Sequence, residues 1–277
     1  MFNNIIGHQD EKKFLINTIK SNNISHSYLF LGKEGIGKKK IALEFCKQIL
    51  NVNNLENCPD FKLIEKKQDK NNIIVEQIRE EILKDIYVAP ISSNKKVYII
   101  NDFEDLNTSA QNALLKTLEE PPSYVVIILI SSKLEKILPT IVSRVNIIKF
   151  NKISNQILKE YISKNYSTKI NDIILDFFDG SIGMINILMY DENIDNLFKI
   201  DKLYNKIIAK DYIGCIQVLS NLDLSKEYSI NYLMYLFNLN NNHICVNIIN
   251  KAYNNLKNNG NYDITIDNMI LKCIDNC

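Results

Sequence analysis

Residues 28–39 of the 277-residue chain read Tyr28-Leu-Phe-Leu-Gly32-Lys-Glu-Gly35-Ile-Gly37-Lys38-Lys39. The apolar run predicts a buried strand, the glycines predict a turn, and the basic residues begin a helix. The spacing satisfies G-x-x-x-x-G-K, in which successive backbone N–H groups curl around phosphate oxygens and Lys38 reaches the outer phosphates. A Gly-rich turn that serves packing alone is the simpler alternative. The flanking strand and helix favour a phosphate-binding loop formed by Gly32, Gly35, Gly37 and Lys38.

The residue that should bind magnesium is missing from this loop. The position after Lys38 normally carries a Ser or Thr hydroxyl, but here it is Lys39, whose ammonium has only donors and repels the ion. The second half of such a site is expected after a later strand, at Val97-Tyr-Ile-Ile-Asn101-Asp102. Asn101 stands where an Asp would organise magnesium, and Asp102 stands where a Glu would orient the attacking water. The sequence therefore predicts a degenerate site that does not hydrolyse nucleotide.

The pattern of apolar residues changes near residue 150. Before it, short apolar runs alternate with amphipathic stretches, which predicts a parallel sheet covered by helices. The predicted strands are 28–31, 61–64, 97–100, 125–130 and 145–150, and the predicted helices are 11–21, 38–50, 75–87 and 108–119, the last with a capping box at 108–111. Helical spacing then dominates, with helices predicted at 153–164, 170–178 and 184–190 and a helical bundle beyond. We expect an α/β plus all-α chain with domains at 1–150, 151–190 and 191–277.

Composition limits the surroundings in which the chain works. Its formal net charge is +1, so no global field favours nucleic acid or a membrane. The six cysteines show no paired spacing, the first residues do not resemble a secretory leader, and no uninterrupted apolar run approaches membrane-spanning length. We expect a cytoplasmic protein with reduced thiols and no membrane contact.

Three longer strings are more specific than the loop. They are Ser25-His-Ser-Tyr-Leu-Phe-Leu-Gly32, Asn112-Ala-Leu-Leu-Lys-Thr-Leu-Glu-Glu-Pro-Pro122 and Leu138-Pro-Thr-Ile-Val-Ser143-Arg144. Over roughly residues 6–189 the chain closely resembles bacterial DNA polymerase III clamp-loader subunits of the AAA+ class. The resemblance implies an AAA+ P-loop NTPase-like domain over 1–150, a small helical lid over 151–190 and a collar-type oligomerisation domain over 191–277, which is short for the family.

Two classes of subunit compete within this family. The gamma/tau motor subunits carry intact ATP sites, whereas the delta-prime subunit usually carries a degenerate one. Lys39 and Asn101 favour delta-prime. Gly183 does so too, because the resemblance places there an arginine that contacts nucleotide in the motor subunits. An active ATPase of the gamma/tau type stays open as the alternative, as does a nucleotide-binding regulatory domain outside replication.

The resemblance gives a role to Ser143-Arg144. In the family this Ser-Arg pair presents its arginine to the ATP site of the neighbouring subunit, where a guanidinium offsets the charge that develops as the γ-phosphoryl group leaves. Without the resemblance, a surface arginine is the simpler interpretation of Arg144. Ser131-Ser132 ends a strand where the family carries a residue that senses the γ-phosphate. Since the metal ligands are lost, we expect a structural role for these two serines.

The resemblance also implies partners and cofactors. The partners are the gamma/tau and delta subunits and, through the complex, the sliding clamp and primed DNA. No cofactor is required, and residual binding of ATP or ADP without magnesium stays open. Relatives often bind zinc through four cysteines between the loop helix and the second strand, but here that interval holds Cys58 alone, so no metal site is expected. We expect a subunit of the DNA polymerase III holoenzyme with no ATPase activity of its own.

Overall fold

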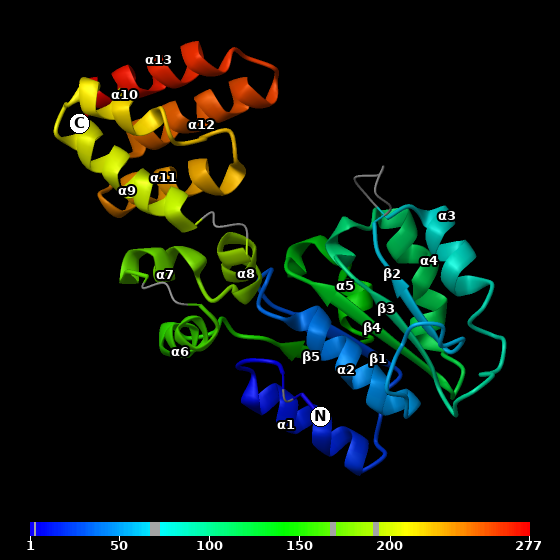
Figure 1. The fold of residues 1–277 in the computed structure, drawn as a ribbon. Helices are drawn as coiled ribbons and strands as arrows, with labels where there is room; N and C mark the ends of the chain where they lie inside the picture. Colours follow the sequence, from blue (N-terminus) through cyan, green and yellow to red (C-terminus); the bar gives the residue numbers. More distant parts are fainter. Residues whose placement is uncertain (3, 67–72, 167–169, 191–193) are drawn as a thin grey trace. The chain divides into compact units, whose positions relative to one another are not determined.

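The computed structural model describes residues 1–2, 4–66, 73–166, 170–190 and 194–277 (Figure 1). Two compact units make up the chain. Unit 1 comprises Met1–Thr168 with Asp179–Met184, and unit 2 comprises Lys169–Phe178 with Ile185–Cys277. The predicted α/β plus all-α class is confirmed. The domain boundaries expected at residues 150 and 190 stay a prediction.

Unit 1 is built around a five-stranded parallel sheet with the strand order β2-β3-β4-β1-β5. The strands are β1 (Ser27–Leu31), β2 (Phe61–Ile64), β3 (Lys96–Ile100), β4 (Val125–Ser131) and β5 (Asn146–Lys149). Each predicted strand is confirmed to within one residue at either end. β1 lies between β4 and β5, with Leu29 opposite both Leu129 and Ile147.

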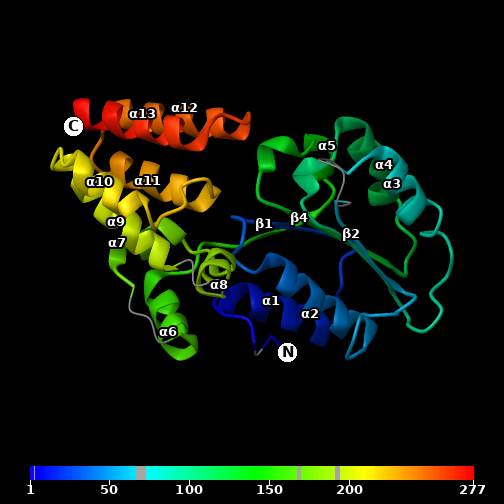
Figure 2. The same ribbon diagram turned by 45° about the horizontal axis from the view of Figure 1, so that its top comes forward.

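Helices cover both faces of this sheet, as Figure 2 shows, with α1 and α2 on one face and α3, α4 and α5 on the other. The helices of unit 1 are α1 (Gln9–Lys20), α2 (Lys38–Leu50), α3 (Val75–Ile78), α4 (Thr108–Glu119), α5 (Pro139–Val142) and α6 (Asn155–Asn165), with short turns η1 (Arg79–Leu83), η2 (Phe103–Asp105) and η3 (Leu134–Lys136). α8 (Ile182–Tyr190) begins in unit 1 and continues into unit 2.

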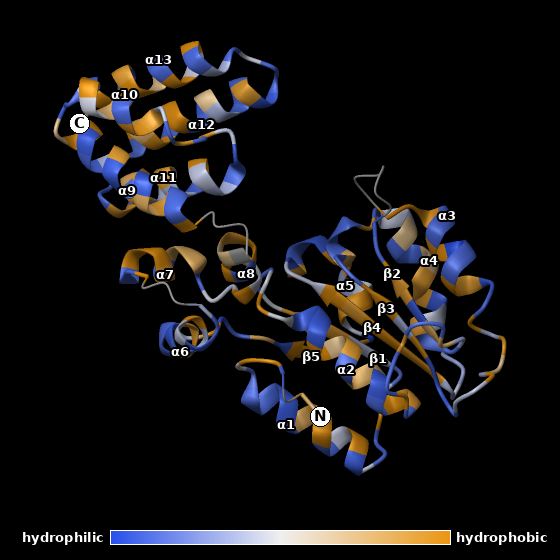
Figure 3. Cartoon of the chain, in the orientation of Figure 1, coloured by the Kyte–Doolittle hydropathy of each residue, from blue (hydrophilic) through white to orange (hydrophobic). Residues whose placement is uncertain are grey.

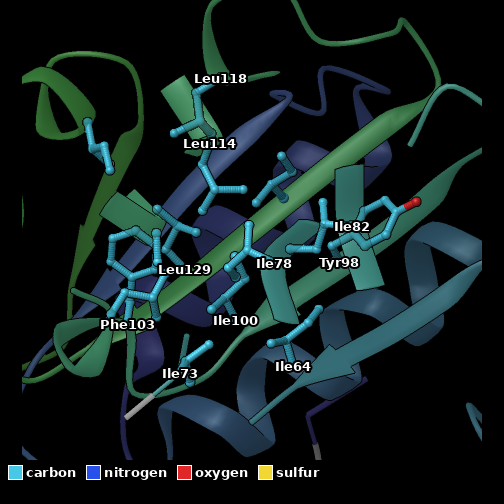
Figure 4. Close-up of a cluster of buried hydrophobic side chains, with 14 of the residues drawn as sticks. Ile64, Ile73, Ile78, Ile82, Tyr98, Ile100, Phe103, Leu114, Leu118 and Leu129 are labelled. Atoms are coloured by element: carbon cyan, nitrogen blue, oxygen red, sulfur yellow. The ribbon is translucent and has the colours of Figure 1, made fainter. Parts of the chain in front are cut away.

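The alternation of side chains along each strand divides the core of unit 1 into two layers. Tyr98 and Ile100 of β3 point into the layer beneath α3 and α4, which Figure 4 shows with Leu114 and Leu129. Val97 and Ile99 enter the opposite layer, together with side chains of α1 and α2. Because both faces are covered, the central strands β1, β3 and β4 are mostly apolar, as the colouring of Figure 3 shows.

The helix predicted at 75–87 is shorter and changes its winding. α3 ends at Ile78 and continues as a π-helical turn, in which the Lys84 N–H donates to the Arg79 carbonyl at 3.1 Å, five residues back. Ile78, Ile82 and Ile86 are all fully buried at a spacing of four residues. This spacing is the signal that predicted a continuous helix, and it does not distinguish an α-helical from a π-helical turn.

The capping box predicted at Thr108-Ser-Ala-Gln111 is wrong. Asn107 caps α4 instead, and its Oδ1 accepts a hydrogen bond from the Ala110 N–H at 2.8 Å. The buried Gln111 donates to the Lys136 carbonyl at 2.9 Å and accepts from the Leu138 N–H at 2.9 Å. Gln111 thus ties α4 to the segment before α5, and these distant partners are not visible in the local spacing.

Unit 2 is a helical bundle. Its helices are α7 (Asp172–Phe178), the later part of α8, α9 (Ile194–Ile208), α10 (Tyr212–Leu219), α11 (Glu227–Leu239), α12 (His243–Lys257) and α13 (Tyr262–Asp275). α9 packs against α10 and α11, and α12 packs against α11 and α13. The buried Tyr232 hydroxyl donates to Asp201 Oδ1 at 2.7 Å, and the Phe177 ring lies 4.8 Å from the Tyr232 ring. Within the described ranges, no helix combines the length and apolar character needed to cross a membrane.

Asp60 organises the loop that leads into β3. This fully buried carboxylate precedes β2. Its Oδ1 accepts from the Ile91 N–H at 2.7 Å, and its Oδ2 accepts from the backbone N–H groups of Ser92 and Ser93 at 2.7 and 2.8 Å and from the Ser92 hydroxyl. Burial would raise the pKa of Asp60, but these hydrogen bonds outweigh it and the pKa is lowered.

Asp60→Asn is expected to lower the free energy of unfolding by about 2–3 kcal/mol. The amide carries no charge, and its NH₂ group would face backbone N–H groups that need an acceptor. Urea denaturation of the full chain measures this loss. Asp10→Asn is the matched control, because the Asp10 side chain is 97% exposed and lies 3.9 Å from Lys13. Its effect should stay below about 0.5 kcal/mol. Equal effects of the two variants would contradict the role given to Asp60.

Candidate functional site

The predicted phosphate-binding loop lies at the carboxyl end of β1, directly before α2. The Gly32 N–H donates to the Ser131 carbonyl at 3.2 Å, which joins the start of the loop to the end of β4. Gly35 and Gly37 have φ values of 75° and 105°, which glycine adopts at little cost. α2 begins at Lys38, so the loop leads into a helix N-terminus, where backbone N–H groups attract anions.

Lys38 is turned into the loop itself. Its Nζ donates to the carbonyls of Gly32 and Lys33 at 2.6 and 2.7 Å, and its side chain is buried. Burial lowers the pKa of Lys38, while the carboxylates of Glu104 and Asp102 oppose this shift. The ammonium therefore lies among the groups that would surround a phosphate.

The remaining loop-side residues gather around a carboxylate that the sequence analysis did not identify, Glu65. Glu65 follows β2, and its Oε1 and Oε2 lie 2.8 and 2.9 Å from the Lys39 Nζ. Asn101 follows β3 and donates its Nδ2 to Glu65 Oε1 at 3.0 Å and to Asp102 Oδ2 at 3.1 Å. The structure thus brings Lys39, Asn101 and Asp102 together at the carboxyl ends of the parallel strands.

These residues do not fit a magnesium ion. The ion needs oxygen ligands, but Lys39 offers an ammonium at the position where the motif requires a hydroxyl. That ammonium already neutralises the Glu65 carboxylate, and Asn101 brings no charge. Across the described part of the chain, no three His, Cys, Asp or Glu residues are grouped so that they could hold a metal ion.

Glu104 is a second residue of the site that the sequence analysis missed. It lies in the turn after β3, and its Oε1 accepts hydrogen bonds from the Ser132 backbone N–H at 2.9 Å and from the Ser132 hydroxyl. Burial would raise the pKa of Glu104, but the bonds from Ser132 outweigh it and lower the pKa. Asp102 shows the opposite shift, since burial and the carboxylates of Glu104 and Asp105 raise its pKa. Ser132 therefore positions Glu104, and Ser131 accepts from the Lys133 N–H at 3.1 Å.

Ser143 and Arg144 lie away from the loop of their own chain. Arg144 lies two residues before Asn146, the first residue of β5, which pairs with Tyr28 near the start of β1. The Ser27 hydroxyl donates to the Arg144 carbonyl at 2.7 Å. The loop follows the other end of β1, and a five-residue strand is about 16 Å long. The structure therefore places this predicted pair at the opposite edge of the sheet.

The guanidinium of Arg144 is held at the surface by three contacts. Its Nη1 donates to the Thr140 carbonyl at 2.7 Å and to the Ser143 hydroxyl oxygen at 3.0 Å. Its Nη2 lies 2.6 Å from Glu119 Oε1. The side chain is 34% exposed, so it is oriented by protein contacts and is accessible from outside.

Gly183 and His8 each donate a hydrogen bond to a carbonyl of the loop. The Gly183 N–H donates to the Gly35 carbonyl at 2.8 Å, and a Cβ at residue 183 would lie only 3.0 Å from the Gly35 Cα. The His8 Nε2 donates to the Ile36 carbonyl at 2.8 Å, and the His8 ring packs edge-on against Phe150. Burial lowers the pKa of His8, because the imidazolium loses its hydration there.

The contact of His8 predicts a pH dependence of stability. The folded pKa lies below the ordinary value of 6.5, so the unfolded chain binds more protons. The stabilisation is complete above about pH 6.5 and is lost as the pH falls through the lowered folded pKa. We expect the free energy of unfolding, measured by urea denaturation, to fall as the pH is lowered below about 6.5. His8→Gln should flatten this slope, since its amide donates without titrating; an unchanged slope would contradict the assignment.

Comparisons with known proteins agree on one family. Residues 7–154 match the family described as DNA polymerase III, delta subunit. The DNA polymerase III subunit gamma of Buchnera aphidicola subsp. Schizaphis graminum is 34% identical over 201 residues, which cover 65% of this chain and 55% of that protein. The DNA polymerase III subunit delta' of Bacillus subtilis is 28% identical over 208 residues, which cover 69% of this chain and 62% of that protein. The chain thus spans 55–62% of the length of these two relatives.

A solved structure shares the fold. A DNA polymerase III gamma-subunit-related protein from Thermotoga maritima matches with a TM-score of 0.59 over 95% of this chain and 99% of that chain, at 18% identity. The relatives include both gamma and delta' subunits, so they do not distinguish the two classes. The family match contains the whole sheet, the loop and Arg144. The chain therefore belongs to the DNA polymerase III, delta subunit family.

Proposed function

We propose that this chain is the delta-prime-type subunit of a DNA polymerase III clamp loader, which loads a sliding clamp onto primed DNA. Its own nucleotide site does not hydrolyse ATP, and Arg144 completes the ATP site of a neighbouring motor subunit. The observation that carries the first part is the ion pair between Lys39 and Glu65. It fills the metal side of the site with an ammonium, and Asn101 is hydrogen-bonded to the same carboxylate.

The position of Arg144 supports an action on another chain. The guanidinium and the loop of this chain lie beyond opposite ends of β1, so the guanidinium does not reach the chain's own nucleotide site. Thr140 and Ser143 fix its orientation while part of it stays exposed. A guanidinium oriented in advance stabilises the charge that develops on a departing γ-phosphoryl group without reorganisation during the reaction.

Composition supports a specific role for this side chain. Arg79 and Arg144 are the two arginines among 33 basic residues, so lysine serves nearly every other basic position. A lysine would supply the charge but not the planar fork that contacts two phosphate oxygens at once. An arginine at residue 144 is therefore best explained by a need for guanidinium geometry.

The partners proposed for the chain are the gamma/tau and delta subunits. Contact with the sliding clamp and primed DNA would come through the complex, and the helices of unit 2 would provide the oligomerisation domain. No cofactor is required by this function, and its place of action is the cytoplasm. Co-purification of the full chain with gamma/tau and delta subunits tests this assembly directly.

The isolated chain is expected to show no magnesium-dependent ATP turnover above background, measured as phosphate release. Lys39→Ser should not restore turnover by itself, because Asn101 still lacks the charge that supports the ion. Turnover that Lys38→Ala abolishes would contradict the proposal. It would favour the alternative of an active gamma/tau-type ATPase, which the glycine geometry of the loop and the similarity to a gamma subunit support.

Arg144→Ala is expected to slow ATP hydrolysis at the adjoining motor site by about a hundredfold or more, since arginines supplied in trans contribute on the order of 10³ to 10⁵ to kcat. The measurement is single-turnover hydrolysis by the loader reconstituted with clamp and primed DNA. Arg144→Lys should remain slow, because a point charge does not replace the guanidinium fork.

Two matched variants separate this role from a structural one. Glu119→Ala breaks the same ion pair but keeps the guanidinium, so hydrolysis should stay near that of the unaltered loader. Arg79→Ala removes the other arginine and should have no effect. Unchanged hydrolysis with Arg144→Ala, or an equal loss with Glu119→Ala, would refute the in-trans role.

A further inference from the structure

Residues 179–183, called the latch segment below, lie directly against the phosphate-binding loop within unit 1. The Gly183 N–H donates to the Gly35 carbonyl at 2.8 Å. A Cβ at residue 183 would lie 3.0 Å from the Gly35 Cα, and a Cβ at Gly35 would lie 2.0 Å from the Ser181 Oγ. Glycine is therefore favoured on both sides, because a Cβ at residue 183 would crowd the Gly35 backbone and Gly35 has a φ of 75°.

The same segment is tied to the loop by charge. Asp179 Oδ2 lies 2.6 Å from the Nζ of Lys33, a residue of the loop, and Asp179 Oδ1 lies 3.0 Å from the Nζ of Lys152. Gly180 packs on the chain after β5, since a Cβ there would lie 2.7 Å from the Ile153 N. One carboxylate thus bridges the loop and the segment that follows the sheet.

Side chains of Lys38 and His8 donate hydrogen bonds to three further carbonyls of the loop. Lys38 donates to the carbonyls of Gly32 and Lys33, and His8 donates to the carbonyl of Ile36. Together with the bond from Gly183, these contacts give partners to four carbonyls of the loop. Buried backbone groups that have partners resist local opening.

We propose that the latch segment fixes the phosphate-binding loop in a single conformation by giving its carbonyls protein donors, so that the conformation does not depend on a bound nucleotide. Asp179 and Gly183 are its positioning residues: Asp179 forms ion pairs with both Lys33 and Lys152, and Gly183 donates a hydrogen bond at a place where a Cβ would be crowded. The joint between the loop and the start of α8 is then independent of nucleotide. This inference goes beyond the role of Arg144 and does not depend on it.

Hydrogen exchange of the isolated full chain, read by mass spectrometry over residues 33–37, tests the latch. Gly183→Ala should speed exchange of these amides by about tenfold, and Asp179→Ala, which removes only half-exposed ion pairs, by about threefold to fivefold, while peptides from β1 and β4 keep their protection. Asp179→Glu should restore much of the protection, because it keeps the charge. Glu80→Gln is the matched control: it removes an exposed ion pair with Lys84, at 2.6 Å, on η1.

A double-mutant cycle that combines Asp179→Ala with Lys33→Gln distinguishes a specific interaction between these residues from a general loss of stability. If Asp179 acts through Lys33, the double variant should exchange little faster than either single variant. ADP added to the unaltered protein should leave loop exchange unchanged. Unchanged exchange in Asp179→Ala, equal speeding with Glu80→Gln, exchange raised throughout unit 1, or new protection of the loop by ADP would each overturn the proposal. All of these readings are separate from hydrolysis by the assembled loader.

Discussion

The hydrogen bonding of β1 between β4 and β5 determines where the rest of unit 1 lies. Tyr28, Leu29 and Phe30 are almost fully buried and alternate between the two core layers, so a shift of register by one residue would exchange those layers. The carboxyl end of this strand continues into the phosphate-binding loop, and its amino end lies beside Arg144. One strand therefore sets both the position of the loop and its separation from the guanidinium.

The Lys39–Glu65 ion pair is important for its position in the site, where the motif requires a hydroxyl, rather than for its contribution to stability. The two side chains are 41% and 38% exposed, and ion pairs of this exposure contribute about 1 kcal/mol or less. Yet the pair sets the charge at the metal side of the loop and holds Asn101 by a third contact. Under the proposed function, this weak interaction excludes a metal ion from the site.

Much of the fold could be predicted from the sequence, because strands such as 61–64 and helices such as 38–50 are specified by residues that are close together along the chain. Predictions from local spacing were wrong or incomplete where a residue's hydrogen-bond partner is distant along the chain. Gln111 resembled part of a capping box, but its partners lie near Leu138. Glu65 formed part of an ordinary run of charges, and its partners Lys39 and Asn101 come from other elements. Glu104 gave no signal, because Ser132 approaches it from the next strand.

The contact between Gly35 and Gly183 also limits how this sequence can change. A Cβ introduced at residue 183 would crowd the Gly35 backbone, and a hydroxyl residue introduced at 39 leaves Glu65 without its ammonium. Under the proposed function, a single substitution at either residue therefore removes a contact without supplying the charge that Asn101 lacks. A hydrolysing loop would require changes at residues 39, 101 and 183 together.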